Sequence, residues 1–387
     1  MKLTLSCIGK FHHFDLARQL DQAGWLDKIY TSYPRWKLKS ERLPQIKIDT
    51  FPWFHSIYMS QGRWPVRSAG MSRLLARFAI KAHDAHVSRM LRSCDVFVGL
   101  SGHNFKAGKR ARAIGARWVC DHGSSHIRYH ATILREEHAR WGVPFLGVPD
   151  WDIEQHLAEY EACDAITISS RFAERTFLEA GVSPIKLRRV AYGVDLSRFY
   201  PVARPENGRF DVVFVGGVTV RKGIPYLIEA FRQLRHPRKS LKIIGGLDPA
   251  FVPWVQTVRD NGVEFMGALP QVKLKEYLSR SHLFVLPSVE EGLALVQAQA
   301  MACACPLLCS ENTGGGDLIT SGVEGFVVPI RDSNAMADRM QQLADDPQQR
   351  EQMSQAALLR VKRLGGWDDY GRAFKRILSE LVGQPTG

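Results

Sequence analysis

The feature that most constrains this chain is a repeated alternation of short apolar runs and helix-like stretches. The apolar runs often end in glycine and polar residues, as in residues 212–217 (VVFVGG), and an amphipathic stretch then follows. Strands that alternate with helices predict an α/β fold, with a parallel sheet covered by helices on both faces. Ligands of such sheets bind beyond the carboxyl ends of the strands, so the polar strand ends are the first candidates for a site.

The alternation runs in two series that are separated by a break. Residues 193–209 (GVDLSRFYPVARPENGR) are rich in glycine, proline and polar residues, which predicts a linker. We therefore expect two Rossmann-like domains, residues 1–192 and residues 210–365, with parallel sheets that face a central cleft. Residues 366–387 are expected to form a final helix that packs back on the first domain. A length of 387 residues suits two domains.

The lack of a targeting signal and the cysteine pattern both suggest an intracellular protein. No apolar run approaches the roughly 18–20 residues of a membrane span. The N-terminal stretch MKLTLSCIGKFHHF is interrupted by Lys10 and has no cleavage site, so it is interpreted as a first strand and not as a signal peptide. We expect a cytoplasmic protein. Seven cysteines, several of them in strand-like runs, are predicted to be reduced core residues.

The net charge of +13 is unevenly distributed along the chain. Between residues 28 and 117, lysine and arginine far outnumber the four acidic residues Glu41, Asp49, Asp84 and Asp95. Such a surface could contact an anionic membrane, could bind nucleic acid, or could be only a solvated face. Aromatic residues interleave with the cations, which suits a membrane interface: Trp36, Trp53, Phe54, Tyr58 and Trp64 with Arg35, Lys37, Lys39 and Arg63.

Residues 212–223 (VVFVGGVTVRKG) join a predicted strand, a glycine turn and two adjacent cations at the start of a helix-like run. A glycine turn lets the backbone approach a phosphate, and the helix start adds its positive end. Arg221 and Lys222 add two full charges, which suits a pyrophosphate. The alternative is a glycine turn before a solvated basic helix start. The stretch matches neither a Walker loop nor the dinucleotide G-x-G-x-x-G pattern.

A second group of polar residues lies in residues 285–319, after a strand that ends at Pro287-Ser288. Glu290, Glu291 and Gly292 are predicted to open a helix, where an acid could act as a cap or accept hydrogen bonds from sugar hydroxyls. The backbone N–H groups of Gly292 to Leu295 would point at the same ligand. Gln299 is expected roughly on the same helix face as Glu291, with donor and acceptor atoms for a ribose.

The chain resembles the retaining glycosyltransferases of the GT-B fold, family 4 (group 1). The resemblance lies in VGGVTVRKGIPYLIEAF, VEFMGAL, LFVLPSVEEGLALVQAQAMACACPLL, SGVEGFVVP and the mid-chain CDAITISS with YGVDLSRFYPV, which cover most of residues 160–330. This set in this order is specific to the family. The first 150 residues resemble it only in outline, as is expected of an acceptor-binding half.

The resemblance implies a role for individual residues around a nucleotide-sugar donor. Arg221 and Lys222 would neutralise the diphosphate, with Gly9 near the phosphates from across the cleft. Glu291 matches the first glutamate of the E-x7-E motif and would hold the donor sugar, beside the main chain of Gly292, Leu293, Ala294 and Leu295. The main chain of Met266, Gly267 and Leu269 would meet the nucleobase, and Gln299 the ribose.

Two positions depart from the family pattern. Gln299 stands where the motif has its second glutamate, and its neutral amide can still hydrogen-bond a ribose, so weaker or altered binding is expected. Gly217 stands where the family often has an arginine in the turn. Arg221 and Lys222 are then left with more of the diphosphate charge.

Residues 119–130 (VCDHGSSHIRYH) follow a strand of the first half and carry three histidines. In the resembling family a histidine after a strand of this half often contacts the sugar near the anomeric carbon, so His122 or His126 is the candidate. A structural role in the loop is the alternative for either. Asp121 with these two histidines is a poor zinc pattern without a further ligand, and we predict no metal and no cofactor. Two further polar groups at strand ends could touch the acceptor or the sugar, but a polar turn is the favoured interpretation: Ser101, His103 and Asn104, and His12 with His13.

These observations favour a metal-independent, retaining glycosyltransferase. It would move a sugar from a nucleotide-sugar, with UDP favoured, to a glycan or lipid-linked acceptor of bacterial surface polysaccharide or glycolipid synthesis. The basic, aromatic first half would contact the inner face of the cytoplasmic membrane. Two alternatives stay open: a nucleotide-sugar epimerase of the same fold, and a basic nucleic-acid-binding protein without catalysis.

Overall fold

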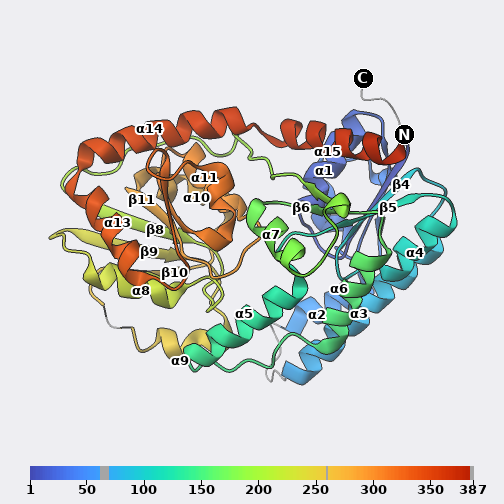
Figure 1. Cartoon of the computed structure of the whole chain (residues 1–387), viewed down its shortest axis with the longest axis horizontal. Helices are drawn as coiled ribbons and strands as arrows, with labels where there is room; N and C mark the ends of the chain where they lie inside the picture. Colours follow the sequence, from blue (N-terminus) through green and yellow to red (C-terminus); the bar gives the residue numbers. More distant parts are fainter. Residues whose placement is uncertain (62–68, 259, 384–387) are drawn as a thin grey trace.

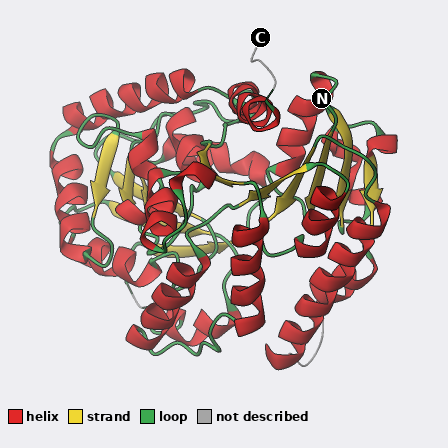
Figure 2. Ribbon diagram, turned by 45° about the vertical axis from the view of Figure 1, so that its right-hand side comes forward, coloured by secondary structure: helices red, strands yellow, loops and turns green. Residues whose placement is uncertain are grey.

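The structure of the protein is a computed structural model that describes residues 1–61, 69–258 and 260–383. These residues form two parallel β-sheets, each with helices on both faces (Figure 2). The predicted fold of two Rossmann-like units is therefore confirmed. Arg63 and Trp64 of the predicted basic, aromatic surface lie outside the described residues.

The first sheet contains seven strands among the described residues, in the order β3-β2-β1-β4-β5-β6-β7, and all neighbouring pairs are parallel. Its central strands are almost fully buried, because both faces are covered. The short β3 was not predicted from the sequence. The strands are β1 (Leu3–Cys7), β2 (Leu26–Thr31), β3 (Ile48–Thr50), β4 (Val96–Leu100), β5 (Arg117–Asp121), β6 (Ala165–Ile168) and β7 (Leu187–Arg189).

The second sheet has the order β10-β9-β8-β11-β12-β13, again with parallel pairs. β8 lies at the centre and continues into the glycine turn before Arg221, so this turn opens at the carboxyl edge of the sheet. The strands are β8 (Phe210–Val215), β9 (Lys239–Ile244), β10 (Val263–Gly267), β11 (Leu283–Leu286), β12 (Leu307–Ser310) and β13 (Gly325–Val328).

Helices cover both sheets and connect the strands. Those before the linker are α1 (His13–Gln22), α2 (Trp53–Ser60), α3 (Ala69–Met90), α4 (Phe105–Ala113), α5 (Ile127–Arg140), α6 (Asp150–Ala162) and α7 (Arg171–Glu179). Those after it are α8 (Ile224–Gln233), α9 (Val252–Val255), α10 (Gln271–Arg280), α11 (Leu295–Ala302), α12 (Gly315–Leu318), α13 (Ser333–Asp345), α14 (Pro347–Leu364) and α15 (Trp367–Val382). Among the described residues, no helix combines the length and the apolar character needed to cross a bilayer.

The last helix, α15, crosses from the second half to the first and lies beside α1 (Figure 1). Phe374 and Leu378 of α15 join the same buried cluster as Phe14 of α1. The two helices approach closely at Gly371, where an added Cβ would lie 2.6 Å from Cβ of Gln19. The chain therefore closes its first half with its own C-terminal helix.

Helix α5 crosses in the opposite direction to α15. It follows a strand of the first half and packs against the second half. Ile133 belongs to the buried cluster of the second half, and the ring of Trp141 meets the ring of Trp254 in α9 edge-on, with centroids 6.0 Å apart. The end of α5 lies next to α9 in Figure 1. Glu137 is fully buried and accepts a hydrogen bond of 2.8 Å from the hydroxyl of Tyr226. Elements of each half thus cover the other half.

Candidate functional site between the two halves

A cleft of about 740 Å³ lies between the two halves. Its wall includes Lys10 from the turn after β1, Gly193 from the linker, and Gln271, Leu295 and Gln299 from the second half. Leu295 and Gln299 are two of the residues predicted to bind the donor. Lys10 directly follows Gly9, which is predicted to lie near the donor phosphates.

The glycine turn after β8 is shaped by close backbone contacts. An added Cβ at Gly223 would lie 2.0 Å from the carbonyl oxygen of Pro287, and Gly223 has a φ of +69° that favours glycine. At Gly217 the nearest atom to an added Cβ is the Thr219 methyl at 3.7 Å, so this side of the turn has room for a ligand. The Val289 N–H donates to the carbonyl oxygen of Arg221, at 3.0 Å. The turn and the loop after β11 are therefore held together.

Arg221 and Lys222 meet Glu290 and Glu291 at this junction. Lys222 forms a close ion pair with Glu291, and Arg221 lies 3.4 Å from the same carboxylate. Burial lowers the pKa of Lys222, although Glu291 opposes the shift. Burial alone would also lower the pKa of Arg221, but Glu291 and Glu290 outweigh it and raise the pKa. The predicted diphosphate cations and the predicted sugar carboxylate are thus direct neighbours.

The predicted helix start at Glu290 is wrong. Residues 287–294 form a loop, and α11 begins at Leu295, so Glu291 and Gln299 do not share a helix face. The loop is held away from helical geometry by its contacts: Gly292 packs on the first half, and Asn312 donates to the Val289 carbonyl oxygen at 2.9 Å. Leu293 and Ala294 of this loop are buried and join the core of the second half.

Glu290 is fully buried, and its carboxylate connects the two halves. One oxygen accepts hydrogen bonds from the hydroxyl groups of Ser124 and Ser125 and from the Ser125 N–H. The other oxygen lies 2.9 Å from Nδ1 of His130 and 3.1 Å from the guanidinium of Arg221. Burial alone would raise the pKa of Glu290, but His130, Arg221 and Ser124 hold it well below its usual range. The buried charge is therefore compensated from both halves.

The halves also touch through their backbones next to this carboxylate. An added Cβ at Gly292 would lie 2.2 Å from the carbonyl oxygen of Gly123. Ser170, at the start of α7, donates its hydroxyl hydrogen to the Gly292 carbonyl oxygen at 2.6 Å. Because Gly292 has no side chain, its backbone can approach the Gly123 carbonyl oxygen this closely.

The structure places both predicted histidines inside the first half, each with protein partners. Nδ1 of His122 lies 2.7 Å from the Ser101 hydroxyl, and Nε2 lies 2.9 Å from the Ser125 carbonyl oxygen. His126 caps α5, where its Nδ1 accepts from the Arg128 N–H. Burial lowers the pKa of His122 to about 3 and that of His126 to about 4, so both are neutral near pH 7. A contact of either with a sugar stays a prediction.

His130, Ser124 and Ser125 are the Glu290 partners that the sequence did not single out. All three reach Glu290 from the loop and helix after β5. His130 lies eight residues after His122, at the end of the histidine-rich stretch, so the signal was present, but the partner is 160 residues away.

The residues predicted to meet the nucleobase lie at the carboxyl end of the edge strand β10. Gly267 has a φ of +68°, and its carbonyl oxygen accepts from the Gly245 N–H at 2.9 Å. Met266 and Leu269 are partly buried against the core of the second half. In the first half, the carbonyl oxygen of Gly9 accepts from the Thr31 hydroxyl at 3.0 Å. All four positions lie at, or within two residues of, the carboxyl end of a β-strand.

An apolar pocket of about 420 Å³ opens beside Ser124 and His130. It is formed by α3, α5, α6 and the loop between α5 and α6. Its wall includes the side chains of Ile80, Leu134, Phe145 and Trp151.

Comparison with known proteins agrees with this architecture. Residues 209–346 match the family described as "Glycosyl transferases group 1". The matched segment makes up most of the second half of the chain, which therefore resembles a group 1 glycosyl transferase domain. The match covers the turn with Arg221 and Lys222 and the loop with Glu290 and Glu291, which are the parts that meet in the structure.

Several known proteins resemble longer parts of the chain. An alpha-D-kanosaminyltransferase of Streptomyces kanamyceticus is 28% identical over 64% of this chain and 66% of its own length. The capsular polysaccharide biosynthesis glycosyltransferase CapM of Staphylococcus aureus is 25% identical over 46% of this chain and 49% of its own. The matches thus span about half to two thirds of these relatives.

Solved structures show the same fold over nearly the whole chain. Sucrose-phosphate synthase (tll1590) of Thermosynechococcus elongatus aligns with a TM-score of 0.77 at 21% identity and covers 99% of each chain. Anabaena Alr3699/HepE in complex with UDP-glucose aligns with a TM-score of 0.68 at 15% identity, over 98% of this chain and 100% of the other. The expected GT-B fold is therefore confirmed.

Proposed function

We propose that this protein is a retaining glycosyltransferase that uses a nucleotide-sugar, UDP-sugar first, and works without a catalytic metal or cofactor. The observation that carries the proposal is the junction of Arg221 and Lys222 with Glu291 at the carboxyl edge of the second sheet. The helix that follows the Glu291 loop supplies Leu295 and Gln299 to the wall of the cleft between the halves. Two fixed cations next to a helix start provide electrostatic stabilisation of a leaving diphosphate. The UDP-glucose in the HepE structure supports the choice of base.

The ion pair between Lys222 and Glu291 suggests how the donor would bind. A diphosphate carries more negative charge than one carboxylate, so it would displace Glu291 from Lys222. The freed carboxylate of Glu291 could then accept hydrogen bonds from the sugar, beside the main chain of residues 292–295. Arg221 would keep Glu290 as a partner and stay in place.

The acceptor is proposed to bind the first half, as a glycan or lipid-linked glycan of bacterial surface polysaccharide or glycolipid synthesis. The apolar pocket beside Ser124 and His130 offers room for an apolar part of such a molecule. On α2 and α3, Trp53, Leu74 and Phe78 are more than half exposed, and Arg77 and Lys81 lie on the same helix pair. This combination supports contact with an anionic membrane at the cytoplasmic face. Sedimentation with anionic vesicles, but not with zwitterionic ones, would test it.

The experiment that tests the donor site is a thermal-shift screen with UDP, GDP, ADP and their sugar conjugates. We expect stabilisation by one nucleotide and its conjugates in the wild type, and loss of the shift in Lys222→Ala. Lys362→Ala, on the exposed side of α14, is the matched control and should keep the shift. No shift with any nucleotide would contradict the proposal. Salt-dependent binding of RNA or DNA in its place would favour a nucleic-acid-binding protein.

A further inference from the structure

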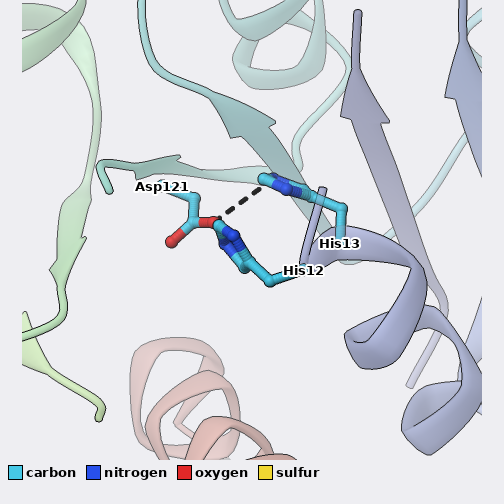
Figure 3. A group of neighbouring side chains, drawn as sticks. All are labelled: His12, His13 and Asp121. Carbon is cyan, nitrogen blue, oxygen red and sulfur yellow. Dashed lines mark hydrogen bonds and ion pairs between the residues drawn. The ribbon is translucent and has the colours of Figure 1, made fainter. Parts of the chain in front are cut away.

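The turn after β1 and the end of β5 bring two histidines and an aspartate into contact. Figure 3 shows His12 and His13, at the start of α1, and Asp121, at the end of β5, with their side chains turned toward one another. Nε2 of His12 lies 2.6 Å from Oδ2 of Asp121, and Nε2 of His13 lies 3.2 Å from the same oxygen. One ligand atom from each of the three side chains lies within 4.8 Å of the other two.

His13 is the member of this group that most needs explanation. Its side chain is fully buried, and neither ring nitrogen has a hydrogen-bond partner among the residues that the structure describes. Buried polar groups in folded proteins are nearly always paired, and an exception points to a partner of another kind. Nε2 of His13 is turned toward the Asp121 carboxylate, but the pair lacks hydrogen-bond geometry.

We propose that His12, His13 and Asp121 form a binding site for a divalent transition-metal ion, with Zn²⁺ the best suited. Two imidazoles and one carboxylate are a ligand set that holds such ions and leaves further positions for water. Bond lengths of about 2.0–2.2 Å to a tetrahedral ion place the ligand atoms roughly 3.3 Å apart. The 3.2 Å separation of His13 and Asp121 matches this value, and a small rotation of the His12 ring would open the shorter contact.

The surroundings of Asp121 suit a metal ligand. Its other oxygen, Oδ1, accepts a hydrogen bond from the hydroxyl of Thr167 on β6, which fixes the carboxylate and leaves Oδ2 for the ion. The side chain of His12 is 10% exposed, so the group is closed on most sides but not sealed. The ring of Tyr192 packs against the ring of His12, tilted by 41° with ring centroids 4.5 Å apart, and so limits its movement.

The bound ion would fix the wall of the cleft on the side of the first half. It would tie the turn with Gly9 and Lys10 to the end of β5, from which the loop to Ser124 and Ser125 departs. Such a role is structural and separate from the proposed neutralisation of a diphosphate by Arg221 and Lys222. The inference therefore does not depend on the proposed function.

The test uses untagged, full-length protein, because a histidine tag would bind the same ions. Chelator-treated wild type would be titrated with ZnCl₂ by calorimetry and with CoCl₂ by visible absorption, which reports coordination directly. We expect one ion per chain in the wild type, and a loss of affinity of at least about 10-fold in His13→Ala and in Asp121→Asn. Zn²⁺ should raise the thermal unfolding temperature of the wild type but not that of these variants.

The pair of His86 and Asp49 provides the matched control. These side chains lie 3.0 Å apart in the same half but belong to no group of three ligands among the described residues. His86→Ala and Asp49→Asn should bind the ion as the wild type does. A wild type that binds neither Zn²⁺ nor Co²⁺ more tightly than Asp121→Asn would overturn the inference, whether or not the variants fold. Metal binding without any nucleotide shift would contradict the proposed transferase and leave the metal site standing.

Discussion

Two buried glutamates, one at the junction of the halves and one in the interior of the first half, have pKa values shifted in opposite directions. Glu290, at the junction, is paired with Arg221 and His130, and its pKa is well below the usual range. Glu159, inside the first half, accepts hydrogen bonds from the backbone N–H groups of Gly102 and Asn104, at 2.6 Å and 3.0 Å. Burial raises the pKa of Glu159 to about 7, although His156 and these N–H groups oppose the shift.

The difference teaches that partner charge, not burial, decides the state of a buried carboxylate. Both side chains are at least 99% inaccessible to solvent. At the junction, an arginine and a histidine offset the desolvation of a full negative charge. In the interior, a single histidine, His156, and two backbone N–H groups offset only part of it. The carboxylate that stays charged, Glu290, therefore lies where the two halves contact each other. The carboxyl group that can become neutral, Glu159, lies inside one half.

The largest expected effect is the loss of the charge at the junction. Glu290→Ala would leave Arg221 and His130 without their carboxylate, and breaking a buried pair costs about 3–5 kcal/mol. We expect the free energy of unfolding, measured by urea denaturation, to fall by that amount. Glu154→Ala, at an exposed position of α6, is the control and should change it little. Equal losses of unfolding free energy in Glu290→Ala and Glu154→Ala would show that the buried charge at the junction contributes no special stability.

The second effect is a pH dependence that belongs to Glu159. Its pKa is raised from an ordinary 4.5 to about 7, so the folded state binds a proton that the unfolded state releases. This stabilisation is fully present below pH 4.5 and is lost as the pH rises through 7, a change on the order of 3 kcal/mol. We expect Glu159→Gln to flatten the curve of unfolding free energy between these pH values. Parallel curves for the variant and the wild type would show that another group titrates there.

The third effect separates contact of the halves from folding of each half. Gly292→Ala places a methyl group against the Gly123 carbonyl oxygen of the other half. Misplacement of a catalytic site by about 1 Å can reduce rates by 10²-fold, so we expect a loss of that order in the proposed sugar transfer, measured as release of nucleoside diphosphate. Gly316→Ala is the control, because an added Cβ there meets no atom within 4 Å. Full activity in Gly292→Ala would show that the halves tolerate a wider separation.

The smallest effect is expected at the exposed edge of the same junction. Arg171 of the first half pairs with Asp317 of the second, but the Arg171 side chain is 65% exposed. Exposed ion pairs contribute about 0.2–1 kcal/mol and weaken with salt. Arg171→Ala should therefore lower the free energy of unfolding by less than about 1 kcal/mol at low salt and by still less at high salt. A loss as large as that of Glu290→Ala would mean that exposure is a poor guide to these contacts.

The sequence by itself determined the two parallel-sheet halves, the break between them and the cations at the end of β8. These features are written in neighbouring residues: VVFV as a strand, the glycines of its turn, and the apolar period of IPYLIEAF. The final helix expected within residues 366–387 is also present, as α15 (Trp367–Val382). The helix expected at Glu290 failed, because Gly292 is fixed by the other half and not by its own neighbours.

Only the tertiary structure decided which polar groups meet. Glu290 finds Ser124, Ser125 and His130 some 160 residues away, and Asp121 finds His12 across 109 residues in place of His122 beside it. The exchange of α5 and α15 between the halves has the same origin. Strand order and the packing of one half on the other set these contacts, and neither leaves a periodic pattern in the sequence. The residue types in each loop determine what that loop can bind, but the tertiary fold determines which distant residues it contacts.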